Sequence, residues 1–407
     1  MKIFVEGALP GETVSVEVTQ QKKAYAKAKL LSLLTPSHER TEPLCPLFGE
    51  CGGCQVMHLQ YPAQLNLKKK RVEDALQRIG GLQDVNVLPC LPSPTSLGYR
   101  NKIQLPVLWK NGQKTLGLYR KNSHEIVSLK RCLIQCSQGE ELLSLISEKL
   151  TLPCVRYVLI RNAVFHEEAL VIFVTTGRYS KELKKFGEEL MEENSLIKGV
   201  VESLNTRCDN VILGPRFRLL AGRPFIYETL LNKIFKISPS AFFQVNPGQT
   251  ENLYGKAIQL AEIEPHEIIL DAYCGVGTLA LFAADRAKHA YGIECIPHAI
   301  ADAIENARLN HLSNCSFICG KAEEMIHQFD SLDILFLNPP RKGCAPEFLT
   351  AVMKIKPQKI IYISCDPATL ARDLSKLKSC YQITIVQPLD MFPQTMHVET
   401  IVRLDRI

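Results

Sequence analysis

The chain has 407 residues, of which 46% are hydrophobic and 22% are charged, so a disordered protein is excluded and two or three folded domains are expected. It contains no apolar stretch of the roughly 20 residues that a membrane-spanning helix needs. Its first residues, MKIFVEGALPGE, lack the layout of a signal peptide. We therefore expect a cytoplasmic protein without a membrane partner.

Positive charge is concentrated in the first third of the chain. Residues 1–131 carry 19 Lys and Arg against 10 Asp and Glu, whereas the remaining residues carry 29 against 32. This excess predicts a polyanionic partner such as RNA, although an ordinary solvated surface would give the same pattern. The densest positions are Lys68, Lys69, Lys70, Arg71, Arg100, Lys102, Arg120, Lys121, Lys130 and Arg131.

The stretches KIFVEG, TVSVEVTQ and YAKAKLLSLL in residues 1–44 alternate apolar and polar residues and are separated by turn residues. This pattern predicts a small antiparallel sheet or barrel. The first residues of the chain already look like an inner strand of such a sheet. We therefore expect that this N-terminal module is incomplete. Residues 61–81 follow with apolar residues at helical spacing and a Gly-Gly stop, which predicts a helix.

The pattern changes twice more along the chain. Strand-like segments dominate from residue 99 to about 227 and are interrupted by helical patterns near 139–149 and 181–193, so we expect residues 45–235 to form a mixed α+β domain. Residues 236–407 alternate apolar strands with helices, the pattern of an α/β, Rossmann-like domain whose parallel sheet binds ligands at the carboxyl ends of its strands. The six expected strands are EIILDAY, HAYGIE, CSFICG, DILFLN, KIIYISC and YQITIVQPL.

A glycine loop follows the first of these strands, in the sequence DAYCGVGT (residues 271–278). Gly275 and Gly277 would let the backbone approach a ligand, and Glu294, at the end of the second strand, could accept hydrogen bonds from ribose hydroxyls. A nicotinamide dinucleotide is one candidate ligand. Since Ala280 replaces the third glycine of the dinucleotide motif, we favour S-adenosylmethionine, which has no phosphate to bind.

Two further strand ends carry chemical signals. Asn338-Pro339-Pro340-Arg341 forms a rigid loop of the kind that holds a planar amino-bearing substrate in many methyltransferases, although a simple strand-ending turn is the alternative. Cys365 lies at the tip of the fifth strand, directly before a helix. We expect that position to lower the pKa of the thiol and to free a nucleophilic thiolate.

One methyl transfer requires such a thiolate, namely methylation of a pyrimidine at carbon 5. Addition of the thiolate to C6 makes C5 nucleophilic, and a base must afterwards remove the C5 proton so that the thiolate can leave. Glu399, which opens the last expected strand, is our candidate base, and His397 is the competitor.

Fifteen cysteines is a high and odd number, which favours reduced thiols over a disulfide framework. The spacing Cys45-x5-Cys51-Gly-Gly-Cys54 nevertheless places three thiols on one tight loop. Cys132 or Cys136 could supply a fourth ligand. Four thiolates suit zinc or an iron–sulfur cluster equally well.

The ordered motifs FFQVN, DAYCGVGT, NPPR, SCDPATLARD and LDMFPQTMHVET resemble the RNA uracil-5 (m5U) methyltransferase family. The similarity covers essentially the whole chain and follows the iron–sulfur branch of that family, the RumA-type enzymes of 23S ribosomal RNA. Residues 1–44 resemble the RNA-binding TRAM domain of this branch. The resemblance implies an S-adenosylmethionine-dependent class I methyltransferase whose substrate is 23S ribosomal RNA before full ribosome assembly, with no DNA substrate.

The resemblance also assigns roles to residues. It implies that Cys365 is the nucleophile and Glu399 the base, and it selects Cys132 as the fourth ligand of a [4Fe–4S] cluster with Cys45, Cys51 and Cys54. Two positions depart from the family pattern: Asn338 replaces the usual Asp, and Lys321 replaces the Asn or Asp that approaches the adenine. The cofactor-binding residues implied by the family are Gln244, Tyr273, Gly275, Gly277, Thr278, Glu294, Lys321 and Asn338.

Two other functions remain open. An amino-group methyltransferase acting on adenine or cytosine would use the Asn-Pro-Pro loop without needing Cys365 or Glu399. An inactive RNA-binding or chaperone protein would keep the cofactor fold without turnover.

Overall fold

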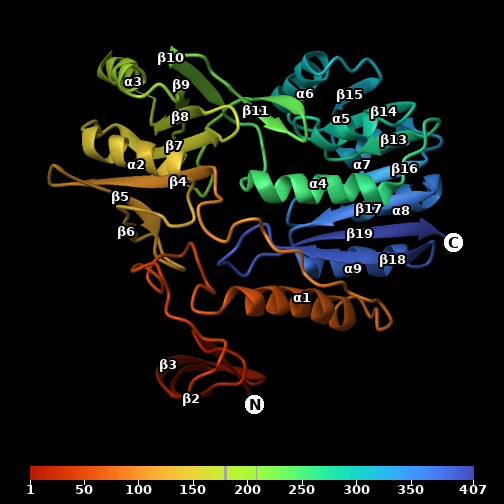
Figure 1. The fold of residues 1–407 in the computed structure, drawn as a ribbon, viewed down its shortest axis with the longest axis horizontal. Coiled ribbons are helices and arrows are strands. Elements are labelled where there is room, and N and C mark those ends of the chain that lie inside the picture. The colour runs from red at the N-terminus through yellow and green to blue at the C-terminus, as the bar shows by residue number, and fades with distance from the viewer. Residues whose placement is uncertain (178–180, 208) are drawn as a thin grey trace.

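The computed structural model describes residues 1–177, 181–207 and 209–407, and Figure 1 shows three parts. A small N-terminal sheet lies at one end, a mixed sheet with two helices lies apart from it, and an α/β unit contains the C-terminus. No helix in these described ranges is long and apolar enough to cross a membrane.

The N-terminal sheet consists of β1 (Lys2–Glu6), β2 (Thr13–Gln21) and β3 (Tyr25–Thr35) in the order β1-β3-β2. The three predicted strands are confirmed, but the antiparallel sheet is only partly right. β2 and β3 form an antiparallel hairpin, whereas β1 runs parallel to β3 along its other edge. Alternation of apolar residues predicts strands but does not determine which edge a strand joins.

The mixed α+β unit has the strand order β10-β9-β8-β7-β4-β5-β6, with β8 and β9 parallel and the other neighbours antiparallel. Helices α2 (Ser137–Lys149) and α3 (Lys181–Glu193) share its apolar core and confirm the two predicted helices. The strands are β4 (Lys102–Lys110), β5 (Gln113–Tyr119), β6 (Ile126–Ser128), β7 (Val155–Ala163), β8 (Glu168–Thr175), β9 (Ile197–Leu204) and β10 (Arg216–Gly222).

The hairpin of β11 (Ile226–Leu230) and β12 (Lys233–Ile237) leads into the α/β unit, whose strand order is β15-β14-β13-β16-β17-β19-β18. Only β19 runs against its neighbours, because it inserts antiparallel between β17 and β18. The strands are β13 (Ile268–Asp271), β14 (His289–Glu294), β15 (Cys315–Cys319), β16 (Ile334–Leu337), β17 (Lys359–Ser364), β18 (Tyr381–Leu389) and β19 (Glu399–Arg406).

Helices cover this sheet on both faces, as a parallel sheet requires, because both of its faces are apolar. One set packs with β13, β16 and β17 in a core that extends to the mixed sheet, and the other packs in a second core on the opposite side. The helices are α4 (Pro247–Ala261), α5 (Thr278–Ala284), α6 (Pro297–Leu309), α7 (Ala322–Met325), the short 3-10 helix η1 (Ile326–Gln328), α8 (Pro346–Ile355) and α9 (Pro367–Leu377).

Helix α1 (Tyr61–Arg78) confirms the predicted helix and lies against the α/β unit, beside α9 and β18 (Figure 1). Its buried Val72 and Leu76 share a core with Leu370 of α9. The chain after α1 continues along the same sheet, with a bridge between Val87 and Val386. Residues 61–91 therefore pack with the last part of the chain, although they lie far from it in sequence.

Candidate active site

The predicted nucleophile and base meet through the pairing of β17 with β19. These strands are antiparallel, and Ser364 pairs with Thr400. Continuing the register by one residue places Cys365 opposite Glu399, at the carboxyl end of the central parallel strand. The inserted last strand thus brings together two residues that lie 34 positions apart in the sequence.

The electrostatics of Cys365 differ from our expectation. Burial and the charge of Glu399 raise the pKa of the Cys365 thiol to about 11, while Arg341 opposes this rise. We expected the free N–H groups at the start of α9 to stabilise a thiolate. Asp366 instead caps α9, and its carboxylate accepts the backbone N–H groups of Ala368 (2.8 Å) and Thr369 (3.1 Å). The prediction of a lowered thiol pKa was therefore wrong for the protein without substrate.

Glu399 is suited to accept a proton near neutral pH. Its side chain is buried, and burial raises its pKa to about 7. The positive charge of Arg341 partly offsets this rise. A carboxylate with this pKa is ionised to a large extent at neutral pH and is still a better base than an ordinary glutamate.

Arg341 is the residue that the sequence reasoning left without a role. It follows the two prolines after β16, and its charge acts on Cys365, Glu399 and His397. Its carbonyl accepts a hydrogen bond from Thr369 Oγ1 at 3.2 Å. The signal was present in the sequence, because Arg341 ends the Asn-Pro-Pro-Arg motif already assigned to the site.

His397, the competing base, lies in the loop directly before Glu399. Burial and the positive charges of Arg341 and Arg71 lower the pKa of its imidazole, so the ring is neutral at pH 7. The ring contacts Phe392 edge-on, with centroids 6.0 Å apart, and the backbone N–H donates to Thr395 Oγ1 at 3.2 Å. A neutral imidazole in this loop could also accept a proton.

The glycine loop and the strand-end acid come together as predicted. Glu294 Oε2 accepts the backbone N–H of Gly275 at 3.2 Å, and its Oε1 accepts that of Ile296 at 3.0 Å. Gly277 has φ +86°, and a Cβ there would lie 3.1 Å from the ring of Phe317. Gly275 has φ +54°, and a Cβ at this position would meet no atom within 4 Å, so open space lies above the loop.

Gln244 is buried and hydrogen-bonds the hydroxyl of Tyr254 in α4. Burial and the charges of Asp271 and Glu399 raise the pKa of that hydroxyl. Asp271, at the end of β13, was not predicted as a site residue. Burial raises its pKa to about 7, and its Oδ1 accepts the backbone N–H of Tyr273 at 3.4 Å.

The remaining predicted cofactor residues occupy different settings. Tyr273 packs against Phe348 with ring centroids 5.8 Å apart, and Thr278 is buried as the first residue of α5. Asn338 is half-buried directly after β16. Lys321 is exposed and pairs with Glu324 at 2.9 Å, so a cofactor contact by Lys321 stays a prediction.

Four of the predicted ligand cysteines surround one small cavity. Cys45, Cys51, Cys54 and Cys132 line a space of about 40 Å³ together with apolar residues, whereas Cys136 is not among its lining residues. Within the described ranges, no three His, Cys, Asp or Glu side chains converge on a position suited to one metal ion. The arrangement thus brings the four thiols together without forming a compact single-ion site.

A broad groove of about 780 Å³ extends from this cysteine loop to Met396 and His397, in the loop before β19. The turn between β5 and β6 forms its opposite wall and contributes polar and positively charged side chains. The lining residues are Gly52, Gly53, Gln55, Leu118, Tyr119, Arg120, Lys121, Asn122, Ser123, His124, Asn210, Met396 and His397.

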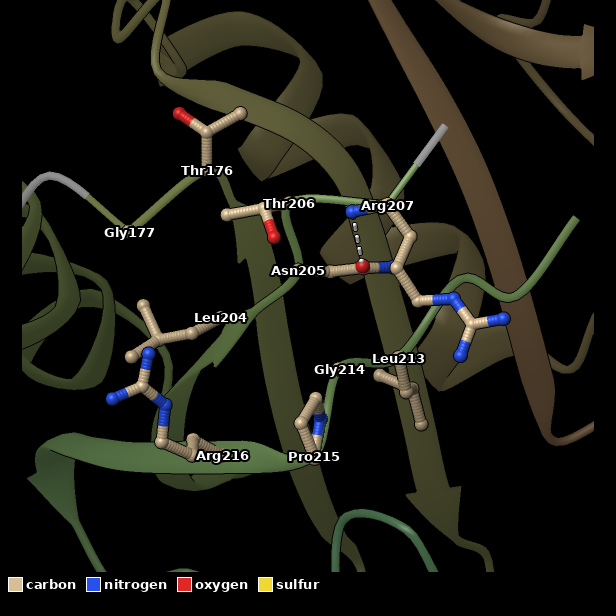
Figure 2. A pocket seen from close by; sticks show the side chains of 10 residues that line it. All are labelled: Thr176, Gly177, Leu204, Asn205, Thr206, Arg207, Leu213, Gly214, Pro215 and Arg216. Carbon is tan, nitrogen blue, oxygen red and sulfur yellow. Dashed lines mark hydrogen bonds between the residues drawn. The ribbon is translucent and has the colours of Figure 1, made fainter. Parts of the chain in front are cut away.

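A second hollow of about 490 Å³ lies where β8 and β9 end and β10 begins (Figure 2). Its rim is held by local contacts, such as the backbone N–H of Arg207 donating to Asn205 Oδ1 at 2.9 Å. None of the predicted catalytic, cofactor or ligand residues lines it. We therefore do not assign it to the reaction.

The expected basic surface is smaller than the sequence suggests. Lys68 is buried and forms an ion pair with Asp390, and Arg71 donates a hydrogen bond to the carbonyl of Met396. Lys69 and Lys70 pair with acidic residues of the same helix. Lys68 and Arg71 therefore hold the loop between β18 and β19 instead of facing a polyanion.

Comparison with known proteins gives consistent results. The family model for tRNA (uracil-5-)-methyltransferase matches residues 216–407, and the TRAM domain model matches residues 2–31. Two relatives named uncharacterized RNA methyltransferase come from Clostridium tetani and Bacillus cereus. They are 40% and 38% identical, over 98% and 100% of this chain and 90% and 92% of their own lengths.

A solved structure is similar over nearly the whole length. It is the Pyrococcus abyssi tRNA (uracil-54, C5)-methyltransferase in complex with S-adenosyl-L-homocysteine. It is 30% identical with a TM-score of 0.77, over 99% of this chain and 95% of that one.

Proposed function

Because this chain belongs to the RNA uracil-5-methyltransferase family, we propose that it methylates carbon 5 of a uridine in RNA through Cys365 and Glu399. The observation that carries the proposal is the register of β17 and β19, which sets a thiol opposite a buried carboxylate. An amino-group methyltransferase would need neither residue in this arrangement.

The reaction follows from these two groups. The thiolate of Cys365 adds to C6 of the uracil, and the displaced electron pair makes C5 nucleophilic. S-Adenosylmethionine, when bound, supplies the methyl group that C5 accepts. Glu399 then removes the C5 proton, the C5–C6 double bond forms again, and the Cys365 thiolate leaves. Arg341 favours the ionised form of both residues.

The glycine loop supports binding of S-adenosylmethionine. The space above Gly275 is open, and two backbone N–H groups hold the Glu294 carboxylate beside the loop. In that position the carboxylate can accept hydrogen bonds from ribose hydroxyls. Asn338 would lie near the sulfonium without adding negative charge. The proposed binding residues are Gln244, Tyr273, Gly275, Gly277, Thr278, Glu294, Lys321 and Asn338.

We propose that the RNA enters along the broad groove, because this groove reaches His397 and carries Arg120 and Lys121 on its wall. Arg120 pairs with Glu50 and Glu125, and Lys121 pairs with Glu6, so RNA phosphates would replace these exposed carboxylates as partners. Our first candidate substrate is 23S ribosomal RNA, as the resemblance implies. The second is transfer RNA, which is favoured by the similarity to the P. abyssi enzyme.

Nucleoside mass spectrometry separates these substrates. Ribosomal and transfer RNA would be purified from cells with and without this protein, and 5-methyluridine would be quantified at each site. Loss of one 5-methyluridine from 23S RNA, restored by the wild-type gene and not by Cys365→Ala, is the expected result. Loss confined to transfer RNA would select the second candidate, and loss of a methylated amino group would overturn the proposal.

We further propose that Cys45, Cys51, Cys54 and Cys132 hold a [4Fe–4S] cluster. The chemistry of the donor set fits, since four cysteines line one small, mostly apolar cavity. Each cysteine of such a cluster binds a different iron atom, so its ligands are spread more widely than those of a single zinc ion. The cluster would cross-link the cysteine loop, whose Gly52 and Gly53 line the broad groove.

A further inference from the structure

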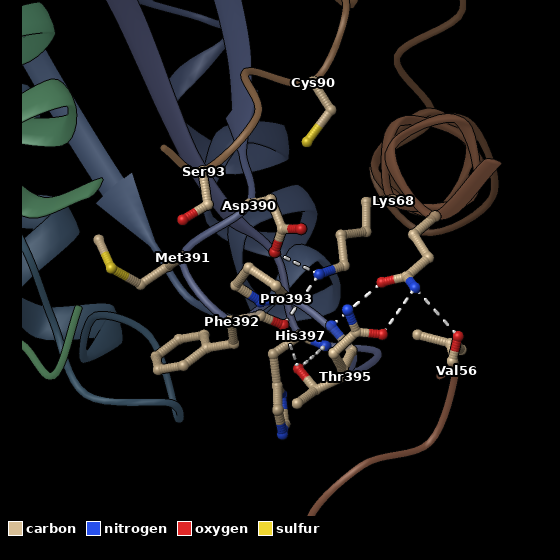
Figure 3. A network of polar contacts seen from close by, with 12 residues as sticks. Val56, Lys68, Cys90, Ser93, Asp390, Met391, Phe392, Pro393, Thr395 and His397 are labelled. Atoms are coloured by element: carbon tan, nitrogen blue, oxygen red, sulfur yellow. Dashed lines mark hydrogen bonds and ion pairs between the residues drawn. The ribbon is translucent and has the colours of Figure 1, made fainter. Parts of the chain in front are cut away.

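The loop that directly precedes the proposed base Glu399, here called the base loop, is held by contacts with other segments. Residues 390–398 connect β18 to β19 without regular secondary structure, so their position depends on contacts with other segments. Lys68 pairs with Asp390 and donates to the carbonyl of Phe392 at 3.0 Å (Figure 3). The hydroxyl of Tyr99 donates to the carbonyl of Pro393 at 3.0 Å.

Gln394 lies at the centre of these contacts. Its φ of +69° is unfavourable for a residue with a side chain, so neighbouring groups must hold it in place. The buried amide of Gln64 does so in both directions: Gln64 Oε1 accepts the backbone N–H of Gln394 at 3.0 Å, and Gln64 Nε2 donates to Gln394 Oε1 at 2.9 Å.

The cysteine loop holds the same residue from the other side. The backbone N–H groups of Gln55 and Val56, directly after Cys54, donate to the carbonyl of Gln394 at 3.0 and 3.1 Å. The side chain of Gln55 also accepts the N–H of Met396 at 3.3 Å. The base loop is therefore supported between helix α1 and the loop that contains the proposed cluster ligands.

We propose that Gln64 and Gln55 are positioning residues for proton abstraction: they hold the Gln394 turn, and through it Glu399, against the adduct on Cys365. The inference rests on the proposed function, in which Glu399 takes the C5 proton. Neither glutamine is needed for attack by Cys365, because Cys365 is fixed by β17 and α9. Their loss should thus slow release of the product more than formation of the adduct.

The test uses full-length protein, RNA substrate and S-adenosylmethionine, with the covalent protein–RNA band measured on a denaturing gel. Gln64→Leu removes the two hydrogen bonds to Gln394, together with those that Gln64 Nε2 donates to the carbonyls of Val56 and Leu59, at similar side-chain size. We expect a methylated adduct at steady state at least fivefold above the wild-type level, with a lower kcat and an unchanged KM for RNA. Gln55→Ala should give the same change to a smaller extent. Gln77→Leu is the matched control, because Gln77 lies exposed on the same helix.

A merely structural role predicts something different, since partial unfolding would lower adduct formation and release together. Wild-type adduct levels in both Gln64→Leu and Gln55→Ala, while Glu399→Gln traps RNA, would overturn the inference and leave the proposed function intact. If no variant, Glu399→Gln included, forms an adduct, the proposed mechanism itself fails. If circular dichroism shows Gln64→Leu to be unfolded, Gln55→Ala decides.

Discussion

At the scale of single residues, the site is defined by three charges that act on one another. The charges of Glu399 and Arg341 both act on the pKa of Cys365, and Arg341 also lowers the pKa of Glu399 against the effect of burial. Since the pKa of Cys365 is raised to about 11, the thiol is protonated at neutral pH before substrate binds. Binding must therefore favour thiolate formation, and Arg341 is the cation placed to assist.

Replacing Cys365 by alanine should abolish methyl transfer and leave affinity for S-adenosylmethionine within about twofold of wild type. The thiol attacks the base and does not belong to the proposed cofactor-binding set, so the two properties separate. Tritiated-methyl transfer to RNA and calorimetric cofactor titration measure them. Near-normal turnover of Cys365→Ala would remove the C5 mechanism and favour methylation of an amino group.

Replacing Arg341 by glutamine should move the acid limb of adduct formation to higher pH. Arg341 lowers the pKa of both Cys365 and Glu399, so its removal raises both and reduces the thiolate fraction at any given pH. Because Arg341 is exposed and screened by solvent, we expect a shift of roughly one pH unit or less. Arg341→Lys, which keeps the charge, is the control. Superimposable pH profiles of the three proteins would show that Arg341 does not act on the thiol.

At the scale of elements, sequence patterns predict which segments are strands and helices but not how the strands pair. The apolar runs identify β13 to β18, and the glycine loop and Cys365 lie at strand ends, as expected. The insertion of β19 between β17 and β18 has no signal in the local pattern, yet it brings Glu399 to Cys365.

Two other features could not be predicted from the local sequence, because each depends on three-dimensional packing. The capping role of Asp366, which uses the N–H groups that might have favoured a Cys365 thiolate, depends on side-chain geometry. The burial of Lys68 depends on Asp390, which lies 322 residues further along the chain. Local charge density therefore suggested a surface cation at a position where long-range packing makes an internal ion pair.

The cysteine loop allows a test that concerns the element and not the reaction. Protein purified without oxygen should be brown and contain iron, and Cys51→Ser should lose the colour and most of the iron, because one of the four thiols around the cavity is removed. Cys136→Ser is the matched control, since Cys136 does not line the cavity. Stoichiometric zinc without iron in the wild type would contradict the cluster.

At the scale of the whole molecule, the first third of the chain holds the loop before β19 and carries exposed lysines. A fragment of residues 236–407 would lose α1 and expose the core beneath it, so the RNA-binding role of the first third must be tested in the full chain. The exposed lysines of the N-terminal sheet suit this test: Lys22, Lys23, Lys27 and Lys29.

Changing these four lysines to glutamine should weaken RNA binding and reduce its dependence on salt. Each phosphate contact to single-stranded RNA contributes roughly −0.7 to the slope of log K against log salt, so the slope should become less steep by up to about 3. Lys184→Gln with Lys185→Gln in α3, where both lysines pair with glutamates, is the control. An unchanged slope in filter-binding titrations would mean that this sheet does not contact the RNA backbone.

The central claim is that Cys365 attacks the uracil and Glu399 completes the reaction. It is tested most directly by incubating Glu399→Gln with RNA and S-adenosylmethionine and resolving the products on a denaturing gel. We predict a stable RNA-shifted band that carries the transferred methyl group and disappears when Cys365→Ala is added to the same chain. Free methylated RNA with no shifted band would contradict the claim and would transfer the base role to His397 or water.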